Sequence, residues 1–229
     1  MKKILSSNSL KIIAVLAMLL DHIAFLFIPV SSLFYFVFRI IGRVTAPIMF
    51  MGIANGYHHT SNKFRYGIRL LFFALISHIP YSLFIDNKVF LYDSYNVLFT
   101  LFLGFLCLCS LYNIKNMFLK IFLIIICILL SYFSEYGLFG ISLIVMFSLF
   151  KTSRWKTYVY SLICLLNLIF VVITTKSMVA FIIYLGLFLV IPLIKLYNGK
   201  KGKYNLKYAF YLFYPLHLLV LVLINLLLG

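Results

Sequence analysis

An acid and a histidine, Asp21 and His22, stand side by side in an apolar run that begins near Leu10 and ends near Pro29. In a membrane-spanning helix an unpaired aspartate costs at least about 2.5 kcal/mol on insertion scales, and such groups usually face the bundle interior or a wet cavity. Adjacent helix positions diverge by about 100°, so these two side chains cannot easily bond each other. We therefore expect a cation to neutralise Asp21 and the imidazole of His22 to face a cavity.

Two cations follow in the next apolar stretch, "FRIIGRVTAP", where Arg39 and Arg43 are four positions apart and share a helix face. We expect Asp21 to pair with Arg43, or with Arg39 in its place. Two alternatives stay open. Either the arginines extend to outer lipid headgroups, or the ion pair only holds two helices together while His22 bonds a backbone carbonyl.

Polar side chains occur in two further apolar stretches. In "SHIPYS", Pro80 removes a backbone donor and disturbs a helix at His78, which frees carbonyl groups for a cavity or a polar partner. In "YNVLFTL", Asn96 and Thr100 are four apart and lie on one face. These residues either line the same cavity as His22 or form ordinary hydrogen bonds between helices.

The last apolar stretch contains "YAFYLFYPLHLL", in which Tyr214 and His217 share a face and Pro215 is expected to kink the helix between them. Tyrosines are common at membrane interfaces, but a histidine in mid-span favours a functional site. A buried histidine near cations suits proton transfer and stabilisation of an oxyanion. It equally suits a proton-coupled transporter, and the residues alone leave both interpretations open.

The elements that must position these residues are membrane helices. The chain of 229 residues is 65% hydrophobic and 10% charged, which excludes a soluble core as the role of most side chains. Apolar stretches of about twenty residues recur without a soluble-looking block, so we expect residues 1–229 to form one all-α, polytopic membrane domain. We predict nine transmembrane helices, at roughly 9–29, 36–57, 67–86, 95–112, 117–133, 136–150, 157–175, 178–197 and 206–228. The fifth and sixth are short, and either tilt little or merge around Glu135.

Basic residues predict the orientation of these helices. With a cytoplasmic N-terminus, all but four of the 20 lysines and arginines fall on the inner side, as the positive-inside rule requires. They are Lys2, Lys3, Lys11, Lys63, Arg65, Arg69, Lys115, Lys120, Lys151, Arg154, Lys156, Lys195, Lys200, Lys201, Lys203 and Lys207. The outer loops then hold Lys88, Lys176, Asp86, Asp93 and Glu135, and the C-terminus is extracytoplasmic. The net charge of +16 therefore reflects topology, and we expect no nucleic-acid partner.

Three other features predict no chemistry of their own. The cysteines at 107, 109, 127 and 164 fall in apolar runs and are expected to act as small hydrophobes. His58 and His59 are neighbours that splay apart on a helix, so no metal site is predicted. The first apolar run lacks a small-residue cleavage site and is expected to remain as a span.

Taken in order, several motifs resemble those of the TraX family. They are "LKIIAVLAMLLDHIA", "RIIGRVTAPIMFMGIANGYHHTSNKFRYGIRLLFFALISHIPYSLF", "NVLFTLFLG", "EYGLFGI" and "NGKKGKYNLKYAFYLFYPLHLL". The ordered set Asp-His, Gly-Arg-x-x-x-Pro, Gly-Tyr-x-x-Thr, Ser-x-x-Pro, Asn-Val-x-x-Thr and Phe-Tyr-x-x-Tyr-Pro-x-His spans nearly the whole chain. Glu135 stands where the family pattern has aspartate before Tyr-Gly, and His78 occupies a variable place in that pattern.

This resemblance implies an integral acetyltransferase of the bacterial cytoplasmic membrane, because the family includes an enzyme that acetylates the N-terminal amine of a conjugative pilin. It implies acetyl-CoA as co-substrate and an amine or hydroxyl acceptor, on a pilin-like peptide or protein, a small molecule or a glycan. Carried over by position, it points to Asp21, His22, Arg43, Asn96, Thr100, Tyr214 and His217, and we expect all of these except Thr100 to be catalytic. Further pocket candidates are Thr100, Arg39, His78 and Glu135.

We expect two basic segments to receive the phosphates of acetyl-CoA from the cytoplasm. These are "NKFRYGIR", with Lys63, Arg65 and Arg69, and "NGKKGKYNLK", with Lys200, Lys201 and Lys203. Either His22 or His217 then deprotonates the acceptor, while Arg43 and Asn96 stabilise the tetrahedral oxyanion. A proton-coupled transporter or flippase and a non-catalytic envelope assembly factor are the alternative functions.

Overall fold

The computed structural model describes residues 3–86, 94–203 and 207–228, and all regular elements within them are helices. The first half of the chain forms α1 (Ser7–Phe27), α2 (Leu33–Gly42), α3 (Thr45–His59), α4 (Lys63–Ile76), α5 (His78–Asp86) and α6 (Val97–Asn113). The second half forms α7 (Met117–Ser131), α8 (Gly137–Leu149), α9 (Ser153–Thr175), α10 (Met178–Tyr184), η1 (Leu185–Leu189), α11 (Val190–Leu196) and α12 (Lys207–Leu228). Lys2, Lys88 and Asp93, which entered the topology prediction, lie outside the described residues.

The predicted all-α, polytopic architecture is confirmed. Within the described residues, six helical segments are long and apolar enough to cross a membrane, and α6, α7 and α8 are shorter apolar helices. Together these segments correspond to the nine predicted spans. The chain is therefore a multi-pass membrane protein.

Three of the long segments are interrupted. The third span breaks between Ile76 and His78, where the sequence predicted a disturbance because Pro80 has no backbone N–H to donate. The second span breaks at Arg43 and Val44, between α2 and α3. The eighth span contains the 3₁₀ turn η1, which the hydropathy pattern did not indicate. Conversely, α12 continues through Pro215.

The short helices α7 and α8 do not merge, and the turn between them folds back into the protein. With 13 residues, α8 is about 20 Å long at 1.5 Å per residue, shorter than the hydrocarbon core of about 30 Å. The turn is tied to the segment that enters α6, because Tyr95 N donates to Phe133 O at 2.7 Å and Glu135 N donates to Tyr95 O at 2.8 Å. At its end Tyr136 adopts a left-handed backbone, with φ of 66°. Glu135 is thereby placed among the helices.

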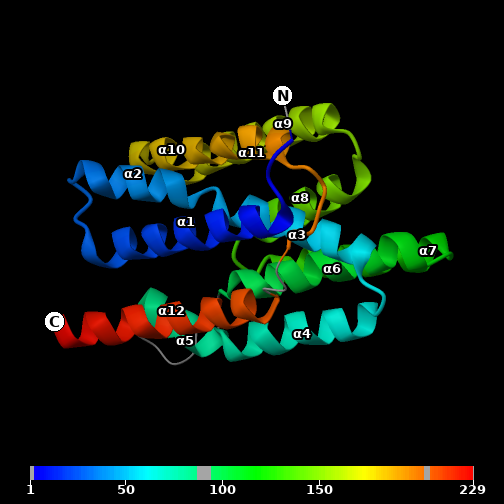
Figure 1. Cartoon of the computed structure of the whole chain (residues 1–229), viewed down its shortest axis with the longest axis horizontal. Coiled ribbons are helices and arrows are strands. Elements are labelled where there is room, and N and C mark those ends of the chain that lie inside the picture. The colour runs from blue at the N-terminus through cyan, green and yellow to red at the C-terminus, as the bar shows by residue number, and fades with distance from the viewer. Residues whose placement is uncertain (1–2, 87–93, 204–206, 229) are drawn as a thin grey trace.

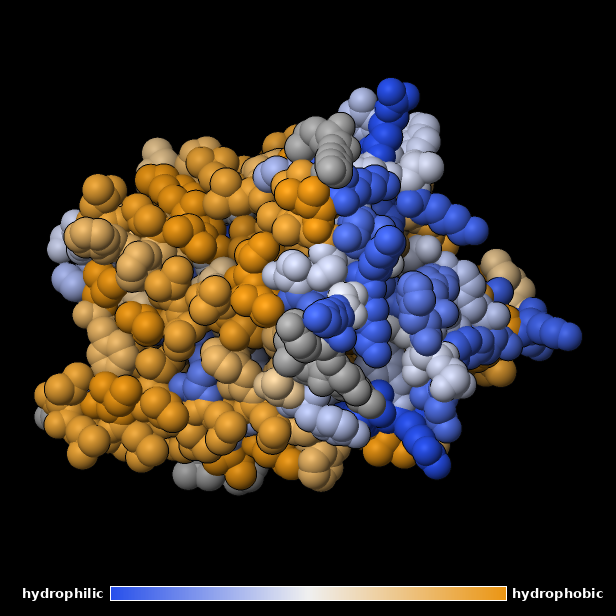
Figure 2. Space-filling model, in the orientation of Figure 1, coloured by the Kyte–Doolittle hydropathy of each residue, from blue (hydrophilic) through white to orange (hydrophobic). Residues whose placement is uncertain are grey.

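The helices run mostly along the long axis of the molecule (Figure 1). In this view α9, α10 and α11 lie along one side, α4, α5 and α12 lie along the other, and α1, α2 and α3 lie between them. Figure 2 shows a broad apolar belt over one end of the molecule and a hydrophilic surface over the other. Comparison of the two views shows that α1 begins near the hydrophilic end and α12 ends at the opposite, apolar end. This separation fits an odd number of crossings.

Candidate active site

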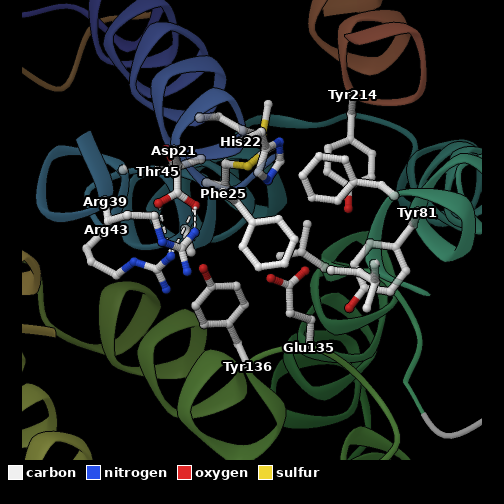
Figure 3. Close-up of a pocket in the computed structure, with 17 residues that line it drawn as sticks. Asp21, His22, Phe25, Arg39, Arg43, Thr45, Tyr81, Glu135, Tyr136 and Tyr214 are labelled. Carbon is white, nitrogen blue, oxygen red and sulfur yellow. Dashed lines mark hydrogen bonds and ion pairs between the residues drawn. The ribbon is translucent and has the colours of Figure 1, made fainter. Parts of the chain in front are cut away.

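A cavity of about 150 Å³, here called the inner cavity, lies among α1, the α2–α3 junction, α5, the turn before α8, and α12. Figure 3 shows polar side chains from all of these elements facing it. The sequence-predicted residues that line it are Asp21, His22, Arg39, Arg43, Glu135 and Tyr214. The structure thus brings together residues that are widely separated along the chain.

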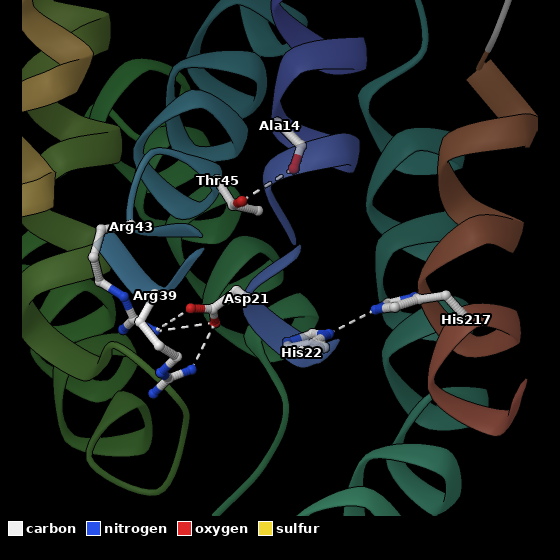
Figure 4. Close-up of polar contacts among 7 residues, drawn as sticks. All are labelled: Ala14, Asp21, His22, Arg39, Arg43, Thr45 and His217. Atoms are coloured by element: carbon white, nitrogen blue, oxygen red, sulfur yellow. Dashed lines mark hydrogen bonds and ion pairs between the residues drawn. The ribbon is translucent and has the colours of Figure 1, made fainter. Parts of the chain in front are cut away.

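Asp21 is neutralised by both arginines. Its Oδ2 accepts a hydrogen bond from Arg39 Nη1 at 2.9 Å, and Arg43 Nη2 lies 3.1 Å from each carboxylate oxygen (Figure 4). The side chains of Asp21, Arg39 and Arg43 are only 11%, 17% and 10% exposed. The ion pair expected between Asp21 and Arg43 is therefore present, and Arg39 joins it, so neither arginine extends away to lipid headgroups.

Gly42 permits this cluster to form. A Cβ atom at position 42 would lie 2.3 Å from the Cβ of Asp21, closer than two carbon atoms can approach. Only glycine therefore allows α2 to pack against α1 at this point. The Gly-Arg motif consequently supplies both a close contact and a partner for the carboxylate.

The two guanidinium groups keep unused donors inside the protein. The Nε atoms of Arg39 and Arg43 are buried and have no hydrogen-bond partner within the described residues. Arg39 stacks over the ring of Phe25 at 5.3 Å, and Arg43 over that of Tyr184 at 5.6 Å. Because a fixed positive charge in a water-poor site stabilises negative charge that develops during a reaction, this pair suits an oxyanion.

His22 and His217 form a hydrogen-bonded pair across 195 positions of sequence. His22 Nδ1 lies 2.8 Å from His217 Nε2, and the two rings are nearly parallel, with an interplanar angle of 6° (Figure 4). His217 Nδ1 lies 2.8 Å from the carbonyl oxygen of Phe213. This geometry constrains the position of every ring proton.

A carbonyl oxygen only accepts hydrogen bonds, so the proton of a neutral His217 must reside on Nδ1. Its Nε2 then accepts, and the proton of a neutral His22 must reside on Nδ1. The remaining nitrogen, His22 Nε2, is therefore unprotonated and free to accept a proton. His22 lines the inner cavity and His217 does not, so the geometry distinguishes two histidines that the sequence left equivalent.

Glu135, Tyr136 and Tyr214 complete the polar lining of the inner cavity. In Figure 3 the Glu135 carboxylate and the Tyr214 hydroxyl point toward its centre. Glu135 lies in the turn between α7 and α8, as expected, and the folded-back turn carries it to the same cavity as Arg43. The charged lining thus consists of two acids and two arginines.

Asn96 and Thr100, which the sequence analysis grouped with the other site candidates, do not line the inner cavity. Asn96 caps α6, since its Oδ1 accepts from Leu98 N at 3.0 Å, while its Nδ2 donates to Ala74 O at 2.8 Å. Thr100 Oγ1 donates to Ser134 Oγ at 3.0 Å and also contacts the carbonyl of Glu135. Both residues are fully buried. Asn96 stabilises the start of α6, and Thr100 binds the turn that carries Glu135.

His78 also lies away from this cavity. Its ring is buried at the start of α5 and packs 4.9 Å from the ring of Tyr95. Within the described residues no group of three His, Cys, Asp or Glu side chains is placed to hold a metal ion.

A second cavity of about 350 Å³, here called the basic cavity, lies near the start of α1, the end of α3 and the start of α4. Three cationic side chains line it, from Lys11, Arg69 and Lys201, together with the aromatic rings of Tyr66 and Tyr211. It adjoins the hydrophilic end of the protein, where α1 begins.

Of the six basic residues predicted to bind acetyl-CoA, only Arg69 and Lys201 line the basic cavity. Lys63 instead donates to Tyr57 Oη at 3.0 Å and to Asn113 Oδ1 at 3.1 Å. Arg65, Lys200 and Lys203 are exposed and line neither cavity.

Sequence reasoning missed Lys11, which we had used only for topology. A signal was present, because Lys11 stands seven positions before Met18 and eleven before His22, so the three residues share one face of α1. That face connects the two cavities.

The two cavities adjoin each other. Met18, Thr45 and Met49 line both the inner and the basic cavity. They form a boundary, one helical turn from His22, between the basic end of the protein and the buried histidine.

Comparison with known proteins adds an independent observation. Residues 6–225 match the family described as "TraX protein". The chain is also 32% identical to "Probable fimbrial assembly protein FimC, serogroup H1" of Dichelobacter nodosus, over 94% of this chain and 94% of that protein. No solved structure matches the chain.

Proposed function

This chain belongs to the TraX family, and from that membership together with the cavity geometry we propose that it is a membrane-embedded acetyltransferase. The proposed reaction moves an acetyl group from acetyl-CoA to an amine of a peptide or protein. The observation that carries the proposal is the unprotonated Nε2 of His22, held beside a buried arginine pair.

His22 acts as the general base in this proposal. Its Nε2 takes a proton from the acceptor nitrogen as that nitrogen, in the neutral amine, forms a bond to the thioester carbonyl carbon. Arg39 and Arg43 stabilise the tetrahedral oxyanion through the positive charge of their guanidinium groups. As the carbon–sulfur bond breaks, His22 returns its proton to the departing thiolate, so the amide and the free thiol are formed and the histidine is regenerated.

Other residues position these groups. His217 fixes the His22 tautomer, as the hydrogen bond to Phe213 O requires. Asp21 holds the two guanidinium groups and balances their charge. The Tyr214 hydroxyl and the Glu135 carboxylate face the same cavity and are placed to receive an ammonium group before it loses its proton.

The basic cavity is the proposed entrance for acetyl-CoA. Its cations suit the phosphates of a nucleotide-bearing thioester, and its tyrosine rings suit stacking of a base. A chain that threads inward from there reaches Met18 and Met49, and beyond them His22. Because acetyl-CoA is a polyanion confined to the cytoplasm, the hydrophilic end then faces the cytoplasm of a bacterial cell, and α12 ends outside.

We propose that the acceptor reaches the inner cavity from the opposite side of the membrane. The relative from Dichelobacter nodosus is named for fimbrial assembly, and the proposed acceptor is an exported peptide whose N-terminal amine is freed on the outer side when its leader is removed. This name also supports a second candidate, a non-catalytic assembly factor that needs the fold but not His22.

Oriented vesicles with purified protein test the proposal. With acetyl-CoA on the side of the hydrophilic end and a peptide with a free N-terminal amine sealed on the other side, the peptide should gain the mass of one acetyl group. Labelling only when both substrates share the hydrophilic side contradicts transmembrane delivery. Absence of labelling in every arrangement contradicts the acetyltransferase itself.

A further inference from the structure

The boundary between the two cavities is formed by two methionines and a threonine. Met18 is 5% exposed, and Met49 is partly buried on the facing helix α3. Methionine is unbranched and flexible, so its side chain can move aside to admit a slender chain and close again behind it.

A hydrogen bond to the backbone holds the two helices together at this boundary. Thr45 Oγ1 donates to the carbonyl oxygen of Ala14 at 3.0 Å (Figure 4), and Thr45 is itself buried. This bond holds the start of α3 against α1, and the methionine side chains are the flexible part of the boundary. The opening therefore depends on the size of Met18 and Met49.

The boundary also lies at the right place to control the acyl group. Met18 precedes His22 by four positions and shares its helix face. A thioester that reaches His22 from the basic cavity must place its sulfur near Met18 and Met49, with the acyl group beyond them in the inner cavity.

The inner cavity offers little room for a long acyl chain. Its volume is about 150 Å³, against about 350 Å³ for the basic cavity, and it must also admit the acceptor amine. Its lining carries Asp21, Arg39, Arg43 and Glu135, and an apolar tail against these groups would remove water from them without replacing its hydrogen bonds.

We propose that Met18 and Met49 select the length of the transferred acyl group and restrict the donor to the shortest acyl thioesters. This inference rests on the proposed acetyltransferase function and specifies the donor class for it. Met18 and Met49 act on specificity, because they touch the donor at the boundary between the two cavities.

Comparison of acetyl-CoA, propionyl-CoA and butyryl-CoA as separate donors tests the inference. The purified full-length protein is given each donor with a synthetic peptide that has a free N-terminal amine, and the acylated peptide is quantified by intact mass. One methylene more or less on a substrate changes kcat/KM by about 10-fold or more when the pocket has no room for it. A smaller side chain at the boundary should therefore reduce the discrimination against the longer acyl donors. Met49→Ala and Met18→Ala should therefore raise the butyryl-to-acetyl ratio of kcat/KM by about 10-fold or more.

Met51→Ala is the matched control. Met51 lies on the same helix as Met49, is 2% exposed, and lines neither cavity. Its replacement removes the same atoms from the protein interior, but it should leave the acyl preference at the wild-type value. A loss of folding alone would affect all donors equally.

Three results would overturn the inference. One is a wild type that transfers butyryl as readily as acetyl, and another is an unchanged ratio in both Met49→Ala and Met18→Ala with acetyl transfer retained. Both leave the proposed acetyltransferase intact. The third, no transfer from any donor by the wild type, would overturn the proposed function and this inference with it.

Discussion

His22 Nδ1 lies 2.8 Å from His217 Nε2, although the two residues are 195 positions apart in the sequence. The Phe213 carbonyl orients His217. In the proposed mechanism His22 is therefore the base, and His217 influences the reaction only by positioning His22.

Mutational coupling tests that dependence. We expect His217→Ala to lower kcat by about 10-fold or more, with KM for acetyl-CoA unchanged, because the base loses its fixed tautomer. In a His22→Ala background the same change should have no further effect, since residues that act as one unit are non-additive. If the fold-losses in kcat of the two single variants multiply in the double variant, that result would contradict the pairing.

The Asp21 cluster should be coupled in stability. Asp21→Asn leaves two buried arginines without their anion, and breaking a buried ion pair costs about 3–5 kcal/mol. Unfolding in detergent, followed for Asp21→Asn, Arg43→Gln and the double variant, gives the coupling energy. We expect the double variant to lose less than the sum of the single variants, and strict additivity would show that the ion pair contributes nothing.

Two glycines provide a matched test of the packing between α1 and α2. Gly42→Ala should lower the free energy of unfolding by about 1–3 kcal/mol, the usual effect of forcing extra atoms into a packed site, because its Cβ would lie 2.3 Å from that of Asp21. Gly52→Ala is the control, since nothing lies within 4 Å of a Cβ there. Equal stability of the two variants would contradict the close contact at Gly42.

Adjacent lysines test the basic cavity. Lys201 lines it and Lys200 does not. An exposed ion pair contributes about 0.2–1 kcal/mol, so Lys201→Ala should raise KM for acetyl-CoA by up to about fivefold, an effect that weakens at high salt. Lys200→Ala should leave KM unchanged, and indistinguishable KM values for the two variants would argue against phosphate binding at this cavity.

The fold and the ion pair were predictable from sequence for a simple reason. Long apolar runs have few stable arrangements other than membrane helices, and a carboxylate inside one requires a cation. The ion pair of Asp21 with Arg39 and Arg43 is therefore predictable from the sequence alone. Pro80 likewise indicated a helix break, because its missing backbone donor is a local property.

The remainder depended on distances that a sequence does not contain. The spacing of Asn96 and Thr100 is the same whether they face a cavity or cap a helix and bind a turn, and only the bonds to Ala74 and Ser134 distinguish these cases. Glu135 was a pocket candidate in the turn between two predicted spans, but hydropathy alone does not indicate that the short α8 lets this turn fold inward. Lysines and arginines are also needed on the cytoplasmic side for topology. The sequence therefore does not indicate which of them line a cavity.

The proposed role of His22 as the general base is tested most directly by comparing acetyl transfer by His22→Ala with acetyl transfer by His58→Ala. His58 bonds Ser148 Oγ at 2.8 Å and lines neither cavity, so its variant controls for the loss of a membrane histidine. Each protein is purified and supplied with acetyl-CoA and an amine-bearing peptide. We predict that His22→Ala lowers the initial rate by about 100-fold or more, the scale of a lost general base, and that His58→Ala retains the wild-type rate. A folded His22→Ala protein that acetylates the peptide at the wild-type rate would contradict this role of His22.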